Sequence, residues 1–110
     1  MKKLFVYSIE CIETTDSGLI ERADEIYLKF AGKKIWPKNA SYEKIIPEDS
    51  KYPNVSVDFE DKKALQLWES DTGESIIHKK DLNQPTNGRR TDDFNGDGGK
   101  YKITYEVQQN

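Results

Sequence analysis

The stretch "TDDFNGDGGKYKITYEV" (residues 91–107) combines turn residues with a regular alternation of apolar and polar side chains. Apolar or aromatic side chains recur at every second position of its second half, namely Tyr101, Ile103, Tyr105 and Val107. This period indicates a β-strand with one face toward a core. The preceding NGDGG segment favours a tight hairpin turn, because glycine adopts left-handed backbone angles at little cost.

The same stretch also matches half of a calcium-binding loop. Asp93, Asn95, Asp97 and Gly98 have the spacing of the first half of a helix–loop–helix calcium site. Such a site needs a bidentate Glu at the twelfth loop position and helices on both sides. Counting from Asp93, that position is Thr104, which lies within the alternating strand. We therefore interpret the segment as a turn rather than an ion site.

Strand patterns also dominate the rest of the chain. The expected strands, separated by turn residues, are residues 3–13, 25–30, 35–37, 52–60, 64–70, 75–82 and 89–94. Short strands at roughly ten-residue spacing are typical of a β-sandwich. The sequence thus predicts an all-β fold, in which residues 1–110 form a single domain, an antiparallel β-sandwich of about eight strands.

Two details of this prediction concern the first part of the chain. In residues 3–13, Phe5, Tyr7, Ile9 and Cys11 alternate, and we expect them to form the core face, with Cys11 as an unreactive buried thiol. In residues 16–26, apolar side chains recur near helical spacing after possible capping residues. There we expect a loop that carries one helical turn.

Composition limits the classes of partner. Seventeen basic and 20 acidic residues give a net charge of −3, which argues against nucleic-acid binding through a basic face. No apolar run approaches the roughly 20 residues that span a bilayer, so no transmembrane segment is expected. The start, "MKKLFVYSIECIE", alternates and soon meets charge, unlike a signal peptide. One cysteine permits no internal disulfide. We expect a cytoplasmic protein, or one released without a conventional signal peptide.

Acidic residues gather in two loops that are far apart in the sequence. One group brackets the loop before the strand at 25–30, and the other lies at and just after the end of the strand at 64–70: Asp16, Asp24, Glu69, Asp71 and Glu74. Calcium takes roughly six to eight oxygen ligands, so a site needs carboxylates from several loops together with backbone carbonyls. If both loops lie at the same end of the sandwich, these five carboxylates could bind one calcium ion.

The two acidic segments, "DSGLIERADEIYLKF" and "LQLWESDTGESII", resemble the C-two-type domain, the calcium- and phospholipid-binding β-sandwich. That family has an Asp, a glycine and a second Asp before a strand like "IYLKF", then an aliphatic strand that ends in an acidic triplet. Glu69 stands where the family usually has Asp, and His78 where it has glycine. The resemblance implies that calcium bridges the acidic loops to an anionic membrane surface. Leu19 and Ile20 would either enter the membrane interface or cap the core.

Catalytic motifs are missing from the sequence. His78 is the single histidine, and no nucleophile elbow, zinc-protease or phosphate-loop motif is present. Paired carboxylates also serve hydrolases, but a sandwich of this length has little room for a deep cleft. We therefore expect a non-enzymatic binding module. The alternative is a metal-free protein-interaction or assembly domain, for example the targeting domain of a toxin or a secretion-system component.

Aromatic and basic side chains suggest further binding options. Trp36 and Trp68 could form a carbohydrate platform, although their places at strand ends favour half-buried core positions. Basic pairs recur at four places, 33–34, 62–63, 79–80 and 89–90. Some could hold an anionic headgroup or a glycan, but basic residues near hairpins more often keep edge strands from pairing.

Overall fold

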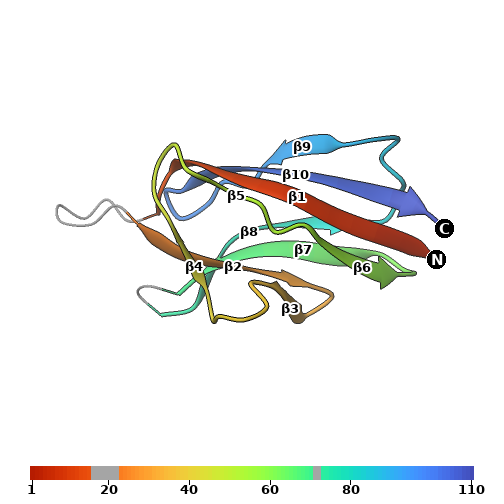
Figure 1. Cartoon of the computed structure of the whole chain (residues 1–110), viewed down its shortest axis with the longest axis horizontal. Coiled ribbons are helices and arrows are strands. Elements are labelled where there is room, and N and C mark those ends of the chain that lie inside the picture. Colours follow the sequence, from red (N-terminus) through yellow and green to blue (C-terminus); the bar gives the residue numbers. More distant parts are fainter. Residues whose placement is uncertain (16–22, 71–72) are drawn as a thin grey trace.

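A computed structural model of the chain describes residues 1–15, 23–70 and 73–110. These ranges contain ten strands and no helix, and the strands form two antiparallel sheets packed face to face (Figure 1). The all-β sandwich expected from the sequence is confirmed. The helical turn expected in residues 16–26 lies mostly outside the described residues, but its last part is strand, since β2 begins at Asp24. Among the residues described, no helix is long and apolar enough to cross a membrane.

The first sheet is built around the pairing of the first and last strands. It consists of β1 (Lys2–Glu13), β5 (Ser50–Lys51), β6 (Val55–Phe59), β9 (Arg90–Asp93) and β10 (Lys100–Gln109). β1 and β10 pair along almost their whole length, so both chain termini lie at the same end of the molecule (Figure 1). β9 forms one edge of the sheet, and β5 and β6 together form the other.

The second sheet has the same layout. It consists of β2 (Asp24–Phe30), β3 (Lys33–Trp36), β4 (Glu43–Ile45), β7 (Lys63–Glu69) and β8 (Ser75–Leu82). β2 and β7 form the centre, β8 lies at one edge, and β3 and β4 share the other edge along β2.

The sequence did not predict β4 or β5. β4 has three residues and β5 has two, which is too short for an alternating pattern to be recognised. Pro37, Pro47 and Pro53 lie in the connections around them. Because proline cannot donate a ladder hydrogen bond, each edge is broken into short segments instead of one continuous strand.

Side chains from both sheets form one hydrophobic cluster between them. The inward residues of β10 are those that the sequence predicts, since Tyr101, Ile103, Tyr105 and Val107 are all buried. Burying a large apolar side chain contributes about 1.5–3 kcal/mol, so this shared interior is the main stabilising feature.

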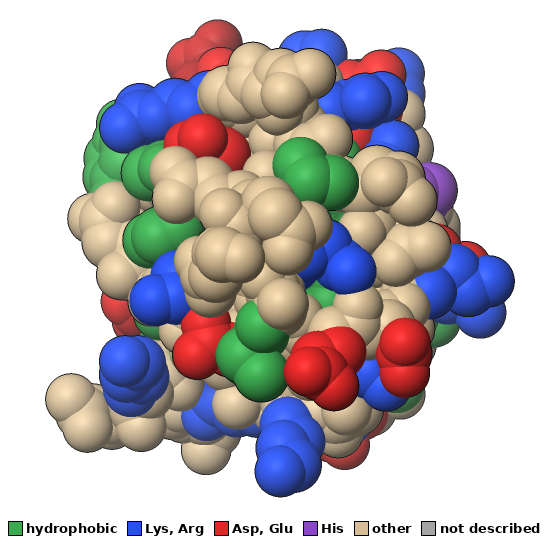
Figure 2. Space-filling view, turned by 90° about the vertical axis from the view of Figure 1, so that its right-hand side faces the viewer, with side chains coloured by type: hydrophobic (Ala, Val, Ile, Leu, Met, Phe, Trp, Pro, Cys, Tyr) green, Lys and Arg blue, Asp and Glu red, His purple; other side chains and the backbone are tan. Residues whose placement is uncertain are grey.

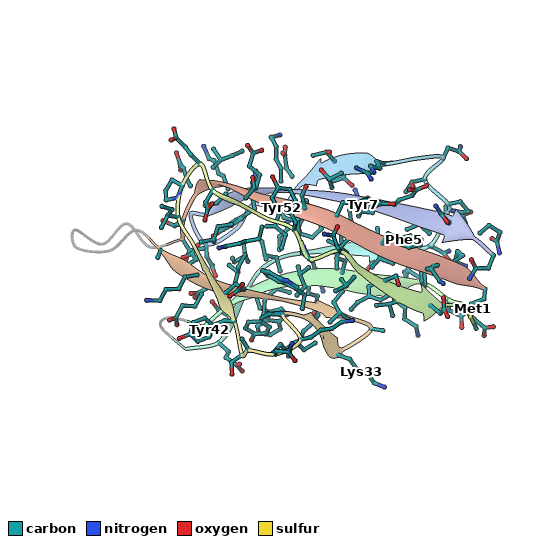
Figure 3. All side chains as sticks on the ribbon, in the orientation of Figure 1. Met1, Phe5, Tyr7, Lys33, Tyr42 and Tyr52 are labelled. Atoms are coloured by element: carbon teal, nitrogen blue, oxygen red, sulfur yellow. The ribbon has the colours of Figure 1, made fainter. Side chains whose placement is uncertain are left out.

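The core face predicted for β1 was wrong in its first half. Leu4 and Val6 are buried, whereas Phe5 and Tyr7 project from the outer face of the sheet (Figure 3). The cause is a β-bulge between Val6 and Ser8 in the pairing with β10. One extra residue exchanges the two faces of a strand, so Ile9 and Cys11 point inward as expected.

Phe5 and Tyr7 make their own contacts on the outer face. Their rings stack with centroids 6.2 Å apart, and the Arg89 guanidinium lies 3.8 Å from the centre of the Tyr7 ring. The Tyr7 hydroxyl donates to Glu106 Oε1 at 2.9 Å. The Tyr7 ring is therefore already covered by a cation from the segment before β9.

Candidate functional site

The two predicted acidic segments meet the ends of neighbouring strands. β2 begins at Asp24 and the antiparallel β7 ends at Glu69, with Ile26 directly opposite Glu69. Asp24 is two residues before Ile26 and therefore on the same, inner face of the sheet. Diagonal neighbours of this kind are about 7–8 Å apart. Asp24 and Glu69 are thus buried carboxyl groups, 0% and 3% exposed, at one end of the sandwich.

Within the described residues, Asp24 accepts three hydrogen bonds. Its Oδ2 accepts from the backbone N–H of Thr15 at 2.8 Å and from the Tyr101 hydroxyl, and its Oδ1 accepts from Thr15 Oγ1 at 2.7 Å. Thr15 follows β1 and Asp24 begins β2, so these bonds tie the end of the first strand to the start of the second. Tyr101 belongs to the first sheet, so its bond to Asp24 also joins the two sheets at this end.

The surroundings of Asp24 keep two neighbouring groups protonated. Burial, and then the hydrogen bond to Asp24, raises the pKa of Tyr101 above its ordinary value. Burial also raises the pKa of the Cys11 thiol to about 11, with a smaller effect in the same direction from the charge of Asp24. At neutral pH both groups are therefore uncharged. Tyr101 keeps its proton and donates it in a hydrogen bond to the carboxylate of Asp24.

Glu69 is bonded within its own hairpin. Ser75, the first residue of β8, pairs with Glu69 and donates its hydroxyl to Glu69 Oε1 at 2.9 Å. The same hydroxyl lies 3.5 Å from Asp97 Oδ2 in the turn between β9 and β10. A third acidic segment is therefore present at the same end of the molecule.

That third segment is the turn quoted at the outset. Gly96 and Gly99 exchange two backbone hydrogen bonds of 3.0 and 2.7 Å, and Asp97 and Gly98 have φ angles of 50° and 80°. These features confirm the predicted hairpin turn.

The sequence assigned Asp97 to this turn but gave no sign that it lies near the other acidic residues. The signal lies in strand pairing: Tyr101 is opposite Cys11, which brings the turn beside the end of β1.

The five predicted ligands do not all fall within the described residues. Asp24 and Glu69 are brought together, whereas Asp16 and Asp71, like the predicted membrane residues Leu19 and Ile20, lie outside the described residues. Glu74 is exposed.

The position of Glu74 can be judged from its effect on Tyr27. Burial, and then the nearby carboxylates of Glu74 and Glu69, raises the pKa of Tyr27 to about 12. Tyr27 alternates with the inward residues of β2, so Glu74 lies near a side chain of the outer face.

Over residues 1–15, 23–70 and 73–110, no group of three or more His, Cys, Asp or Glu side chains has an arrangement that could hold a metal ion. Among the described residues, Asp24 and Glu69 by themselves do not form a metal site. Each carboxylate oxygen has about two acceptor positions, and from the described part of the chain Asp24 Oδ1 receives one hydrogen bond. A complete calcium shell would need further oxygen ligands from the connecting segments.

The two tryptophans occupy different environments. Trp36 is buried and belongs to the hydrophobic cluster. Trp68 lies outside that cluster, on the outer face of β7, where it stacks on Tyr27 at 6.1 Å and carries the Lys29 ammonium 4.4 Å from its ring centre. Trp68 is half-buried, as expected, but it does not belong to the core, and Trp36 is more deeply buried than expected. Trp36 is buried and the Trp68 indole is covered by Lys29, so the two tryptophans do not form an open carbohydrate platform.

At the end of the molecule that carries both termini, no single kind of side chain, basic, acidic or hydrophobic, dominates the surface. Figure 2 shows basic, acidic and uncharged side chains interspersed across this end, with hydrophobic side chains scattered among them. A duplex-binding surface would instead gather its cations on one face.

Comparison with known proteins gives no family assignment. No protein-family model matches the chain, and no curated protein is significantly similar to it. The similarity to the C-two-type domain therefore stays a prediction from the two acidic segments.

Proposed function

We propose that the chain is a non-enzymatic binding module that binds calcium at the end formed by Asp24, Glu69 and the segments joined to them. Through the bound ion it attaches to an anionic surface such as a membrane. One observation carries the proposal: Asp24 and Glu69 are buried diagonal neighbours on the inner face of β2 and β7. Two buried carboxyl groups so close together repel each other when both are charged, and a divalent cation removes that repulsion.

The remaining ligands come from the adjoining segments of the chain. Asp16 precedes Asp24 in the segment that Thr15 and Asp24 flank, and Asp71 follows Glu69 by two residues. Carboxylates of both, with backbone carbonyls, complete the proposed oxygen shell. A calcium ion with an open coordination position can bind a phosphate oxygen of a lipid headgroup, and Leu19 and Ile20 then contact the membrane interface.

Thermal unfolding with and without calcium tests the metal site. An ion that binds the native state alone stabilises it by about 2.7 kcal/mol at a hundredfold excess over its dissociation constant. We expect the melting temperature to rise in millimolar calcium and this rise to disappear in Asp71→Asn. The matched control is Asp58→Asn, an exposed carboxylate 3.8 Å from Lys3 in the first sheet, which should keep the full rise. Identical melting curves with calcium and with chelator would refute the proposal.

Vesicle sedimentation tests the surface partner. We expect calcium-dependent binding to vesicles that contain phosphatidylserine, and none to vesicles of neutral phosphatidylcholine. If calcium stabilises the protein but the protein binds neither kind of vesicle, the metal site is supported and the membrane role is refuted.

A second candidate function is a metal-free protein-interaction module. What favours it is that hydrogen bonds from Thr15 and Tyr101 already hold Asp24 in place, so this end is held together without an ion. Analytical ultracentrifugation over a range of concentrations separates the two candidates. Self-association that is unchanged by chelator, together with unchanged melting in calcium, supports the interaction module.

A further inference from the structure

A hollow lies at the far end of β8 from Ser75 and Glu69. Its volume is about 480 Å³, within the range of small-ligand sites, and it lies between the end of β8, the connection 83–89 and β9. The residues that matter here are Lys80, Asp81, Asn83, Gln84, Asn87, Arg90 and Tyr105. Since the calcium proposal concerns the opposite end of β8, this hollow is a separate site.

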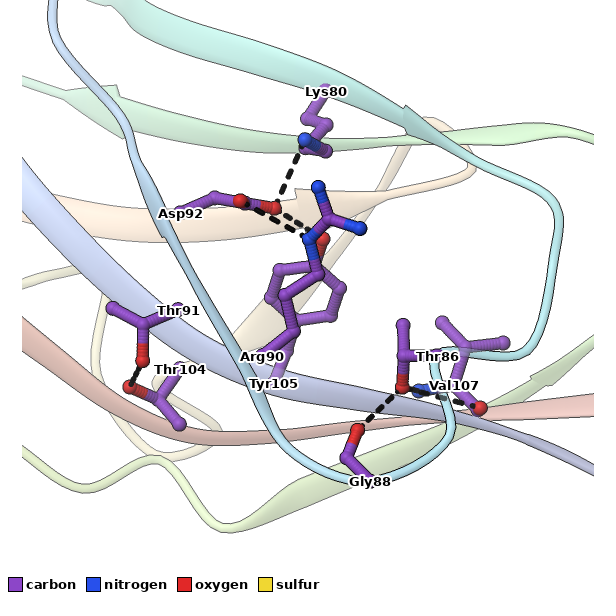
Figure 4. A network of polar contacts seen from close by, with 9 residues as sticks. All are labelled: Lys80, Thr86, Gly88, Arg90, Thr91, Asp92, Thr104, Tyr105 and Val107. Carbon is purple, nitrogen blue, oxygen red and sulfur yellow. Dashed lines mark hydrogen bonds and ion pairs between the residues drawn. The ribbon is translucent and has the colours of Figure 1, made fainter.

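A network of charged groups fixes Arg90 at the hollow (Figure 4). Asp92 Oδ1 accepts from Arg90 Nε at 3.2 Å, and Asp92 Oδ2 accepts from Lys80 Nζ at 2.9 Å and from the Tyr105 hydroxyl. Two cations thus share one carboxylate, and the carboxylate of Asp81 adds a second negative charge to the lining of the hollow. Nε is the atom bonded to Asp92, and no contact is drawn from the two terminal nitrogens of Arg90 to the other residues shown (Figure 4).

The connection that forms one wall is anchored to the first sheet through Thr86. Its backbone N–H donates to the Val107 carbonyl at 3.0 Å, and its hydroxyl accepts from the Val107 N–H at 3.1 Å. The same hydroxyl donates to the Gly88 carbonyl at 2.6 Å. The wall is therefore ordered before any ligand arrives, which lowers the entropy cost of binding.

Three amide side chains surround the hollow. Asn83, Gln84 and Asn87 are exposed, and within the described part of the chain their side chains make no hydrogen bond. Each amide offers a carbonyl acceptor and two N–H donors, which matches hydroxyl groups that both donate and accept. Asp81, whose carboxylate is 3.9 Å from Lys62, adds an acceptor at the rim.

We propose that this hollow binds a small polyhydroxylated carboxylic acid, with a sugar acid such as glucuronate as the representative ligand. The terminal nitrogens of Arg90 hold the carboxylate in a two-bond fork, and the amides of Asn83, Gln84 and Asn87 bind the hydroxyls. The planar guanidinium matches a carboxylate in geometry as well as in charge. Tyr105, buried beneath Arg90, keeps the floor of the site in place.

An NMR titration of the isotope-labelled protein tests this site with three probes: glucuronate, glucose and acetate. We expect saturable shifts of the side-chain amide signals of Asn83, Gln84 and Asn87 with glucuronate, at a dissociation constant below about 10 mM. Glucose lacks the carboxylate and acetate lacks the hydroxyls, so each should bind at least about tenfold more weakly. Glucose as strong as glucuronate, or no saturable shift with glucuronate, would overturn the proposal.

The chain supplies a matched pair of variants. Arg90→Gln removes the fork and should weaken glucuronate binding about tenfold or more. Arg90→Lys keeps the charge without the fork and should also weaken it. Arg89→Gln changes the neighbouring arginine, which stacks on Tyr7 and does not line the hollow, and should leave the affinity unchanged. Equal losses in the Arg89 and Arg90 variants would mean a general charge effect and would also overturn the assignment.

Discussion

The hydroxyl of Tyr101 donates a hydrogen bond to the carboxylate of Asp24, from the last strand of one sheet to the first residue of β2 in the other. Both side chains are fully buried. The two sheets of a sandwich are otherwise held together by apolar packing, which has little directional preference. A buried polar pair at one end therefore fixes how the two sheets are aligned there.

Tyr101→Phe should lower the free energy of unfolding by about 1–3 kcal/mol, because Asp24 remains buried and loses the hydrogen bond that joins it to the other sheet. Urea unfolding at neutral pH measures the loss. Tyr105→Phe is the control, since its partner Asp92 is partly exposed and keeps Lys80 and Arg90. A larger loss in Tyr105→Phe than in Tyr101→Phe would contradict the importance assigned to the inter-sheet bond.

The success of the fold prediction depended on how regular each strand is. β10 alternates without interruption over residues 101–107, and its buried face was predicted correctly. In β1, both faces carry apolar side chains, so Leu4 and Val6 compete with Phe5 and Tyr7 for the core. The bulge between Val6 and Ser8 decides between them, and it arises from pairing with β10, a strand about a hundred residues away. Local alternation contains no information on that partner.

The candidate site was predictable to a similar extent. Strand boundaries alone suggested that Asp24 and Glu69 come at strand ends, and an antiparallel pairing of the two strands is enough to bring them together. The proximity of Asp97 to Ser75 depends instead on how the two sheets pack, because Ser75 belongs to one sheet and the β9–β10 turn to the other. The partners of Asp24 were also hidden, because Tyr101 reads as an ordinary core residue in the sequence and lies 77 positions away.

Asp92 predicts a specific dependence of stability on pH. Burial by itself raises the pKa of Asp92, but the hydrogen bonds from Tyr105, Lys80 and Arg90 outweigh it and lower the pKa below the ordinary value. The unfolded chain therefore binds the proton more readily. The stabilisation is present above the unfolded pKa of about 3.9, and it is lost as pH falls through the lower folded value.

Comparison of the wild type with Asp92→Asn measures this contribution. At neutral pH the variant should be less stable by about 1–2 kcal/mol, because it loses charge-assisted hydrogen bonds. The difference in the free energy of unfolding should stay constant down to about pH 5 and shrink below about pH 4. A difference that stays constant through the acid range would show that Asp92 has no depressed pKa in the folded protein.

Cys11 should react only after unfolding. Its side chain is 0% exposed and its pKa is about 11, so little thiolate is present at pH 8 and reagents cannot reach it. We expect iodoacetamide labelling, followed by mass spectrometry, to be slow in buffer and fast in concentrated urea. Rapid labelling of the native protein would mean that β1 opens locally at this position.

Gly96 is the position where a single methyl group should be least tolerated. A Cβ built on Gly96 would lie 1.7 Å from the carbonyl oxygen of Ile77 in β8, which is backbone and cannot rotate aside. Gly96→Ala should therefore separate the β9–β10 turn from β8 and destabilise the protein by several kcal/mol, on the order of 3 kcal/mol or more. Circular dichroism melting curves measure the effect.

Gly88→Ala is the matched control for this substitution. Gly88 has a φ of 108°, but no atom lies within 4 Å of its Cβ position, so the substitution introduces backbone strain without a clash. That strain should cost about 1–3 kcal/mol. If Gly96→Ala melts at or above the temperature of Gly88→Ala, the turn does not pack against β8 as closely as the distances indicate, and the proximity of Asp97 to Ser75 is also in error.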